Sequence, residues 1–274
     1  MNVSPDRCCI LNSGSGAWAF EPLARDLSKA IGVDLSETPR DFNYILYWES
    51  EVPPPFASFI DWNAIRAASD KRLLAKLFDD HDVPRPETKL CETFSNVRQH
   101  LKANRNREWC LKYPTSCGAA GHILLTDLIN EPVNWPRPFI VQEFIRLSTP
   151  EVFRTYVIGG EMFGWVVRRF PAGVTKSPWV AHARGARYEI LEGAPETAAR
   201  AAQHALNAAG LSDSFGCADL MQKPDGNWVV LEIGTDGVFN HVDREIGNEQ
   251  FEHALKTRVA DAFWSVAQRY FCQQ

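Results

Sequence analysis

The chain has 274 residues, of which 45% are apolar and 23% are charged, and its formal net charge is −5. These are ordinary values for a globular protein, and the length is sufficient for two or three lobes with a substantial core. The negative balance argues against nucleic acid as a partner. No apolar run approaches the ~18 residues of a membrane span, and the N-terminus lacks the pattern of a signal peptide. We therefore expect a cytoplasmic protein without a membrane partner.

The seven cysteines are an odd number, and none of them forms a CxxC pair. This spacing argues against a disulfide framework and against a zinc site. Reduced thiols agree with the expected cytoplasmic location.

The N-terminal region alternates strand and helix patterns. Residues 8–12 and 42–48 are apolar and strand-like, whereas residues 21–31 have the periodicity of an amphipathic helix. This alternation predicts a small α/β lobe. Three prolines within residues 52–56 predict a loop after it.

The middle of the chain combines one helix with two strands. The pattern predicts a helix over 70–80 with Ser69 as its N-cap. Apolar strands over 108–114 and 138–145 then bracket a loop at 115–122 that contains glycines.

The second half begins with two strands in residues 152–170 that are joined at Gly159-Gly160. An alanine-rich helix ends at Gly210, and a hairpin formed by 215–222 and 228–233 follows it. The pattern closes with an amphipathic helix over 251–271.

The hairpin carries two carboxylates, Asp219 and Glu232. Facing carboxylates on paired strands suit Mg²⁺, which takes oxygen ligands and shares them with phosphate groups. Buried, unpaired carboxylates would otherwise be costly. The alternative is that both side chains point into solvent.

Lys112 lies on a predicted strand and is followed by Gly118 and Gly121. A loop of small residues lets backbone N–H groups approach phosphates, while a lysine supplies a positive charge. The loop is not a Walker A motif, and taken alone it is a weak signal for which a simple structural turn is the favoured interpretation.

In chain order, the motifs are a helix starting at Asp70-Lys71, the strand with Lys112, the glycine loop, a strand ending in QEFI, two arginine-bearing strands and the carboxylate hairpin. The series resembles the ATP-grasp superfamily and, within it, the RimK-like branch that contains ribosomal-protein glutamate ligase and glutathione synthetase. The resemblance covers residues 65–270. It implies an α/β fold made of α+β lobes, in which a Rossmann-like lobe (1–65) precedes two grasping lobes (66–145 and 146–274).

The resemblance also implies a nucleotide site. Lys71 and Lys112 would hold the α- and β-phosphates of ATP, beside the loop with Gly118 and Gly121. QEFI would be the hinge between the grasping lobes, and its members are Gln142, Glu143, Phe144 and Ile145, of which Glu143 and Ile145 would offer backbone groups to adenine. Glu151 is the nearest candidate for the ribose hydroxyl groups.

The same resemblance implies the groups that act on the phosphates. Arg154 and Arg168 would neutralise the γ-phosphate and the carboxylate that attacks it, and Arg184 would lie near the substrate. Asp219 and Glu232 would bind two Mg²⁺ ions, which Glu232 would bridge. Mn²⁺ could take the place of Mg²⁺. Strand alternation predicts that only one residue of the Arg168-Arg169 pair faces inward, and we favour Arg168.

The chain departs from the family at the metal site. Gly234 stands where the family has a metal-binding asparagine. Asp236 or Asn240 could supply the missing oxygen, and this alternative stays open, as does a site with one metal ion or a weakened enzyme.

The resemblance implies an ATP-dependent carboxylate–amine ligase that forms an amide through an acyl phosphate. We expect an amino acid, a peptide or a natural-product intermediate as substrate, chosen by the first lobe and by the loop at 171–188. Trp18 and Trp179 lie in predicted loops. For each of them, contact with the substrate and packing against the protein are alternative roles. A kinase acting on a small molecule and a nucleotide-binding protein without catalysis are the alternatives. A homodimer is expected only from the family.

Overall fold

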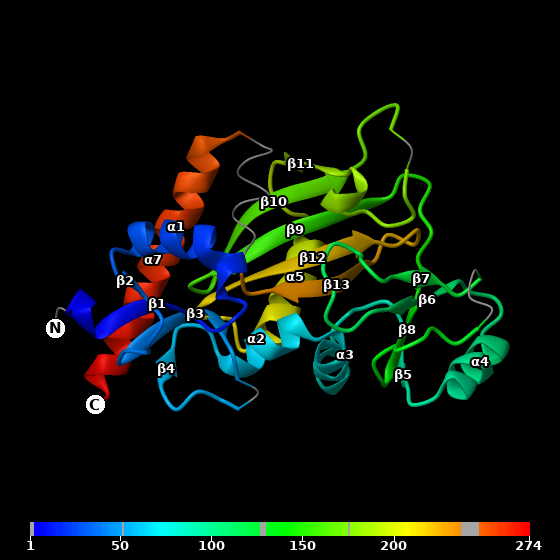
Figure 1. Ribbon diagram of the computed structural model, residues 1–274. Helices are drawn as coiled ribbons and strands as arrows, with labels where there is room; N and C mark the ends of the chain where they lie inside the picture. The colour runs from blue at the N-terminus through cyan, green and yellow to red at the C-terminus, as the bar shows by residue number, and fades with distance from the viewer. Residues whose placement is uncertain (1–2, 51, 127–129, 175, 237–246) are drawn as a thin grey trace.

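The computed structural model describes residues 3–50, 52–126, 130–174, 176–236 and 247–274. The molecule has three β-sheets, and the five-stranded sheet lies between the two four-stranded ones, with both chain termini at the end that carries the first sheet along the chain (Figure 1). Within the described ranges, no helix combines the length and the apolar character needed to cross a membrane.

The first sheet has the strand order β2-β1-β3-β4, and all of its pairs are parallel. Its strands are β1 (Cys8–Ser13), β2 (Asp34–Ser36), β3 (Phe42–Trp48) and β4 (Ala57–Ser58), with the helix α1 (Glu21–Ile31) between β1 and β2. Two 3-10 helices, η1 (Pro5–Arg7) and η2 (Ala17–Phe20), flank β1. The predicted α/β character of this region is therefore confirmed.

Two consecutive helices, α2 (Trp62–Ser69) and α3 (Lys71–Asp80), lead out of the first sheet. The N-cap predicted at Ser69 is wrong, because α2 continues to that residue and its hydroxyl donates to the carbonyl of Ile65. Asp70 caps α3 instead, since its backbone is extended and its carboxylate accepts from the N–H of Arg72 at 2.8 Å.

The second sheet has the order β5-β8-β6-β7 and is antiparallel. It comprises β5 (Thr88–Cys91), β6 (Trp109–Lys112), β7 (Ile123–Leu124) and β8 (Phe139–Glu143), and α4 (Phe94–Ala103) follows β5. Val97, Leu111 and Phe139 belong to a hydrophobic cluster of its own. The predicted strands around the glycine loop are β6 and β8, which are neighbours in this sheet.

The third sheet is also antiparallel, with the order β11-β10-β9-β12-β13. Its strands are β9 (Glu151–Ile158), β10 (Glu161–Arg169), β11 (Arg187–Ile190), β12 (Phe215–Gln222) and β13 (Trp228–Gly234). The 3-10 helix η3 (His182–Arg184) precedes β11. The helix α5 (Glu196–Ala208) packs its alanines and Leu206 into the main core together with Leu220 and Val230, so one face of the sheet is covered. The other face is free to carry polar side chains.

The last helix, α7 (Glu249–Cys272), returns to the first sheet and lies beside α1 (Figure 1). The ring of Phe263 contacts Phe42 with a centroid distance of 5.3 Å. Trp264 Nε1 donates to the carbonyl of Ile31 at 2.9 Å. The C-terminal helix is thus built into the core of the N-terminal α/β unit.

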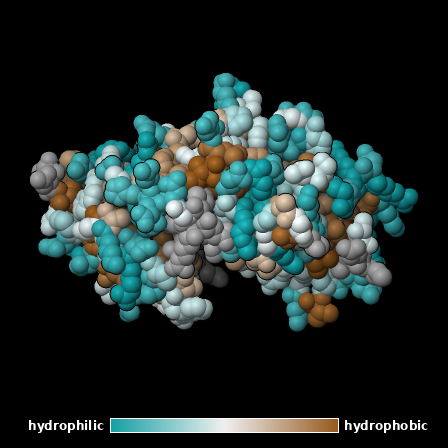
Figure 2. Space-filling model, turned by 90° about the horizontal axis from the view of Figure 1, so that it is seen from above, coloured by the Kyte–Doolittle hydropathy of each residue, from teal (hydrophilic) through white to brown (hydrophobic). Residues whose placement is uncertain are grey.

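Seen from above, hydrophobic side chains gather in a few separate groups between hydrophilic ones (Figure 2). Trp18 is among the exposed large hydrophobic residues, at 79% exposure. Its position in η2 is therefore compatible with contact to a bound molecule, whereas it contributes little to the core.

Candidate active site

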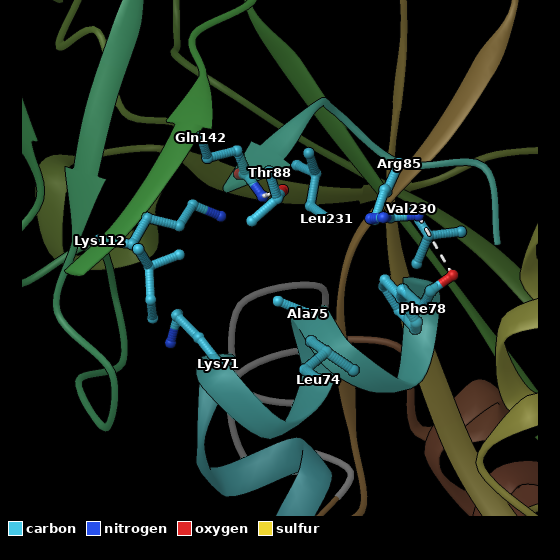
Figure 3. A pocket seen from close by; sticks show the side chains of 11 residues that line it. Lys71, Leu74, Ala75, Phe78, Arg85, Thr88, Lys112, Gln142, Val230 and Leu231 are labelled. Carbon is cyan, nitrogen blue, oxygen red and sulfur yellow. Dashed lines mark hydrogen bonds between the residues drawn. The ribbon is translucent and has the colours of Figure 1, made fainter. Parts of the chain in front are cut away.

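A pocket lies where the second and third sheets meet α3 (Figure 3). It is lined from α3, from the strands β5, β6 and β8 of the second sheet, and from β13 of the third, and the residues are Lys71, Leu74, Ala75, Phe78, Arg85, Thr88, Lys112, Ile140, Gln142, Val230 and Leu231. Apolar walls with a few converging polar groups are typical of a small-molecule site.

Two lysines enter this pocket from different elements. Lys71 occupies the first turn of α3, and its Nζ donates to the carbonyl of Ser116 at 2.6 Å. Lys112 is buried at the end of β6. Because its side chain is enclosed, its charge is less screened by water than that of a surface lysine.

Glu232 on β13 is the carboxylate between these lysines. Its Oε1 lies 3.5 Å from Nζ of Lys71 and 3.8 Å from Nζ of Lys112. Burial opposes ionisation of this carboxyl group, but the two ammonium groups outweigh it and lower the pKa of Glu232. The carboxylate is therefore ionised at neutral pH.

Beside this cluster, the face of the third sheet that α5 does not cover carries a second group of charges, which are buried. In the strand register, Arg154 on β9 is opposite Asp219 on β12, and Asp219 is opposite Glu232 on β13. Directly opposite residues project to the same face, so the pairing itself brings these side chains together. Arg154 Nε and Nη2 donate to Oδ1 and Oδ2 of Asp219 at 2.6 and 3.0 Å.

Arg168 completes this second group. Its Nη2 donates to Oδ2 of Asp219 at 3.0 Å, and its Nη1 donates to the hydroxyl of Tyr188 at 3.1 Å. Burial alone would raise the pKa of Asp219, but the guanidinium groups of Arg154 and Arg168 lower it to about 2. Two fixed cations thus meet one fixed anion in a buried position.

The neighbouring residues on the same strands face away from this group. Arg169 pairs with Glu151, at 3.1 Å between Nη1 and Oε1, and with Glu189. The interpretation that only Arg168 of the pair points inward therefore agrees with the structure. Glu151 lies on the opposite face from Arg154, so the structure does not bring it together with the other site residues, and its ribose role stays a prediction.

The residues predicted to form the hinge, 142–145, end β8 and begin the loop after it. Gln142 is buried, and its Nε2 donates to Oγ1 of Thr88 at 2.9 Å. The N–H groups of Glu143 and Phe144 donate to the carbonyls of Glu87 and Glu108, both at 2.8 Å. These two N–H groups are thus already used within the sheet, so a nucleotide base would have to use carbonyl groups here or the backbone of Ile145.

The glycine loop between β6 and β7 has an unusual backbone. Gly118 and Gly121 have φ of +61° and +69°. A Cβ at Gly121 would lie 2.8 Å from Cβ of Tyr113, whereas one at Gly118 would lie 3.6 Å from Cβ of Ala183. Gly121 is therefore required both by its conformation and by space. Ala183 belongs to η3, whose last residue, Arg184, is exposed.

Asp219 and Glu232 are the described residues that fit a divalent cation best. Within the described ranges, no group of three His, Cys, Asp or Glu side chains could hold a metal ion. Two carboxylates are nevertheless a suitable donor set for Mg²⁺ when phosphate oxygens complete its coordination. In the structure both carboxylates are instead neutralised by lysine and arginine.

Asp236 and Asn240 are the two predicted sources of a third oxygen ligand for the metal ion, and the structure describes only Asp236. A Cβ at Gly234 would lie 3.7 Å from Oδ1 of Asp236 and 2.9 Å from Sγ of Cys217. Burial raises the pKa of Cys217 to about 12, and the carboxylates of Asp219 and Asp236 contribute to the rise. Asp236 thus lies near the same strand ends, whereas Asn240 lies outside the described residues. The choice between them stays a prediction.

Three further residues at the site were not identified from the sequence. Thr88 holds Gln142, and Leu231 lines the pocket from β13. His122, at the end of the glycine loop, influences the pKa of Glu232. Its place four residues after Gly118 was the signal that could have identified it, because loops that enclose a ligand place side chains next to it.

No family model matches this chain, and neither does any curated protein. Solved structures do match over nearly the whole length. The ATP-grasp ligase PsnB in complex with a minimal precursor, Mg and ADP is 14% identical, with a TM-score of 0.64 and coverage of 96% of this chain and 99% of PsnB. The fold is that of the ATP-grasp ligases.

Two other structures of this fold extend the comparison. The D-cycloserine synthetase DcsG is 16% identical, with a TM-score of 0.63 and coverage of 94% of this chain and 99% of DcsG. The D-alanine–D-alanine ligase from Bacillus anthracis in complex with ATP is 13% identical, with a TM-score of 0.68 and coverage of 98% of both chains. The ATP-grasp fold predicted from the order of motifs is thus confirmed.

Proposed function

We propose that this protein is an ATP-dependent carboxylate–amine ligase of the RimK-like kind. The observation that carries the proposal is the meeting of Lys71, Lys112 and Glu232 at the pocket, with the Arg154–Asp219–Arg168 group on the same sheet face. Four cations and two anions are more charge than a folding core needs, but they suit a site for a polyanion and its divalent cation.

The arrangement divides the work between two groups of residues. Lys71 and Lys112 would hold the α- and β-phosphates, with the backbone of the glycine loop above them. Arg154 and Arg168 would neutralise the γ-phosphate and the incoming carboxylate. Asp219 and Glu232 would hold Mg²⁺, which when bound would neutralise the phosphates further. Each arginine and lysine can change partner from a carboxylate to a phosphate without leaving the site.

The reaction would occur in two displacements. A carboxylate oxygen of the first substrate attacks the γ-phosphorus atom, and the bond from that phosphorus atom to the bridging oxygen breaks, which releases ADP and leaves an acyl phosphate. The nitrogen of an amine then attacks the carbonyl carbon. Phosphate leaves with the former carboxylate oxygen, a proton is lost from nitrogen, and an amide remains. Charge neutralisation and positioning supply the catalysis.

The substrate class is the finer part of the proposal. PsnB is described in complex with precursor peptides, and DcsG is described as a D-cycloserine synthetase. These neighbours favour a peptide or an amino-acid-derived compound as the carboxylate or the amine. The loop between β10 and β11 and the first sheet are the parts that would select it.

The test is ADP release with Mg²⁺ and ATP against amino acids and short peptides, offered singly and in pairs. We expect release that requires both a carboxylate and an amine. With an ¹⁸O-labelled carboxylate, one labelled oxygen should appear in the released phosphate. Release with a single hydroxyl compound, without label in phosphate, would show a kinase instead. ATP binding without turnover by any pair would favour a binding protein.

A further inference from the structure

His122 stands out among the described residues because its imidazole is enclosed but unsatisfied. It lies at the end of the glycine loop, directly before β7, and both of its ring nitrogens are buried without a hydrogen-bond partner in the described part of the chain. Buried polar groups are normally paired, and leaving one unpaired costs about 1–3 kcal/mol. An imidazole always has at least one N–H group to donate. The ring is therefore placed for a partner that the described residues do not supply.

The charges around His122 indicate what that partner is. The groups that act on it are Lys112 from β6, Glu232 from β13, Lys71 from α3 and Arg184 from η3. Three of the four are cations, and they belong to three separate elements. A cationic ligand would be repelled here and a neutral one would gain little from these charges, whereas an anion with several oxygens would be attracted by all three cations.

The ring is held in place by aromatic packing. Its centroid lies 5.1 Å from that of Trp179 at an interplanar angle of 63°, and Trp179 in turn lies 5.1 Å from Phe144 of the hinge. The packing fixes the orientation of the imidazole without using its nitrogens. A leucine could fill the same space, so packing alone does not account for a histidine with two orphaned nitrogens.

We propose that His122 is a phosphate-binding residue of the ATP site, which donates an imidazole N–H to an oxygen of the β- or γ-phosphate. The proposal rests on the function proposed above. It adds a side-chain donor to the backbone N–H groups of the glycine loop. Lys71 already connects that loop to α3 through the carbonyl of Ser116. His122 is thus carried on the segment that covers the phosphates.

The experiment measures the affinity of ATP and of AMP, each with Mg²⁺, by titration calorimetry on the full chain. His122→Leu keeps the volume and removes the donor, and His122→Gln and His122→Asn keep an N–H at the positions of Nε2 and Nδ1. The control is His100→Leu. His100 also has a buried, unpartnered Nε2 within the described ranges and contacts Trp109 edge-on at 4.3 Å, but it lies on α4.

We expect His122→Leu to weaken ATP binding about ten-fold or more, as for a lost hydrogen bond to a charged group, with AMP binding unchanged. One of the two amide variants should retain ATP affinity, and His100→Leu should change neither ligand. The melting temperature of His122→Leu should equal or exceed that of the wild type, because an orphaned polar group is removed.

The proposal is overturned if His122→Leu binds ATP as tightly as the wild type, or if it loses affinity for ATP and AMP equally. If His122→Leu does not fold, the two amide variants test the proposal. One of them must keep the affinity for ATP and the other must lose it. If both variants lose affinity for ATP and AMP equally, the proposal is contradicted. A wild-type protein that binds neither nucleotide would instead overturn the proposed function and, with it, this role of His122.

Discussion

Arg154 and Asp219 form a bidentate pair in the interior, with Nε–Oδ1 and Nη2–Oδ2 distances of 2.6 and 3.0 Å and both side chains at most 10% exposed. The two residues are 65 positions apart in the chain and meet because β9 and β12 are neighbours in one sheet. Within this pair, the guanidinium of Arg154 and the carboxylate of Asp219 neutralise each other. It must open if Asp219 binds a cation and Arg154 binds a phosphate.

Arg154→Lys should lower the free energy of unfolding by about 1–3 kcal/mol, because an ammonium group cannot replace both hydrogen bonds of the guanidinium. Arg146→Lys is the matched control. Arg146 also forms a bidentate pair, with Glu108 at 2.8 and 2.6 Å, but its side chain is 59% exposed. Its loss should be under about 1 kcal/mol. Urea unfolding at pH 7 measures both, and equal losses would contradict a special role of the buried pair.

The pKa of Asp219 predicts how stability depends on pH. Because the folded-state pKa is about 2, below the ordinary value of 3.8, the stabilisation is complete above about pH 4 and is lost as the pH falls toward 2. A difference of this size corresponds to about 2 kcal/mol. The stability of the wild type should therefore fall by about 2 kcal/mol more than that of Asp219→Asn over this range. Urea unfolding from pH 5 downward tests it, and parallel curves would mean that the carboxylate is not held ionised.

Glu232→Gln should separate nucleotide binding from its dependence on Mg²⁺. Removal of the anion between Lys71 and Lys112 should strengthen ADP binding in EDTA by several-fold. In the variant the lysines bind a phosphate without first giving up their contact with a carboxylate. The gain on adding Mg²⁺ should disappear, and ATP turnover should be lost while the fold is retained. Calorimetry with and without Mg²⁺ measures this. Glu189→Gln, which removes an exposed partner of Arg169, is the control. An unchanged Mg²⁺ effect in Glu232→Gln would remove Glu232 from the metal site.

Gly121→Ala should damage the glycine loop more than its backbone angle alone explains. Gly193 and Gly121 have similar φ angles of +57° and +69°. A Cβ at Gly193 would meet nothing within 4 Å, whereas a Cβ at Gly121 would lie 2.8 Å from Cβ of Tyr113. We expect about 1 kcal/mol for Gly193→Ala and clearly more for Gly121→Ala, with weaker ATP binding only in the latter. Thermal unfolding and nucleotide titration distinguish them. Identical effects would mean that the loop can relax away from Tyr113.

Some features of the fold and the site could be predicted because they are local. Period-two alternation placed β9, β10 and the β12–β13 hairpin, and it selected Arg168 rather than Arg169 as the inward residue. Helical periodicity placed α1, α5 and α7 to within a few residues. The boundary at Ser69 was wrong because two adjacent residues, Ser69 and Asp70, are both good caps, and only the path of α2 decides between them.

The sequence by itself determined the order of the elements and the identity of the charged residues, since both depend on periodicity and on side-chain chemistry. Only the tertiary structure decided which charges meet. The strand order of the third sheet pairs Arg154 with Asp219, and the first turn of α3, where Lys71 bonds to the carbonyls of Pro114 and Ser116, brings Lys71 to Glu232. It also decided that α7 completes the core of the first sheet and that no described residue forms a hydrogen bond with the ring of His122. These contacts join residues far apart in the chain, and no local pattern encodes them, because their energy comes from burial and pairing that exist only once the sheets have packed.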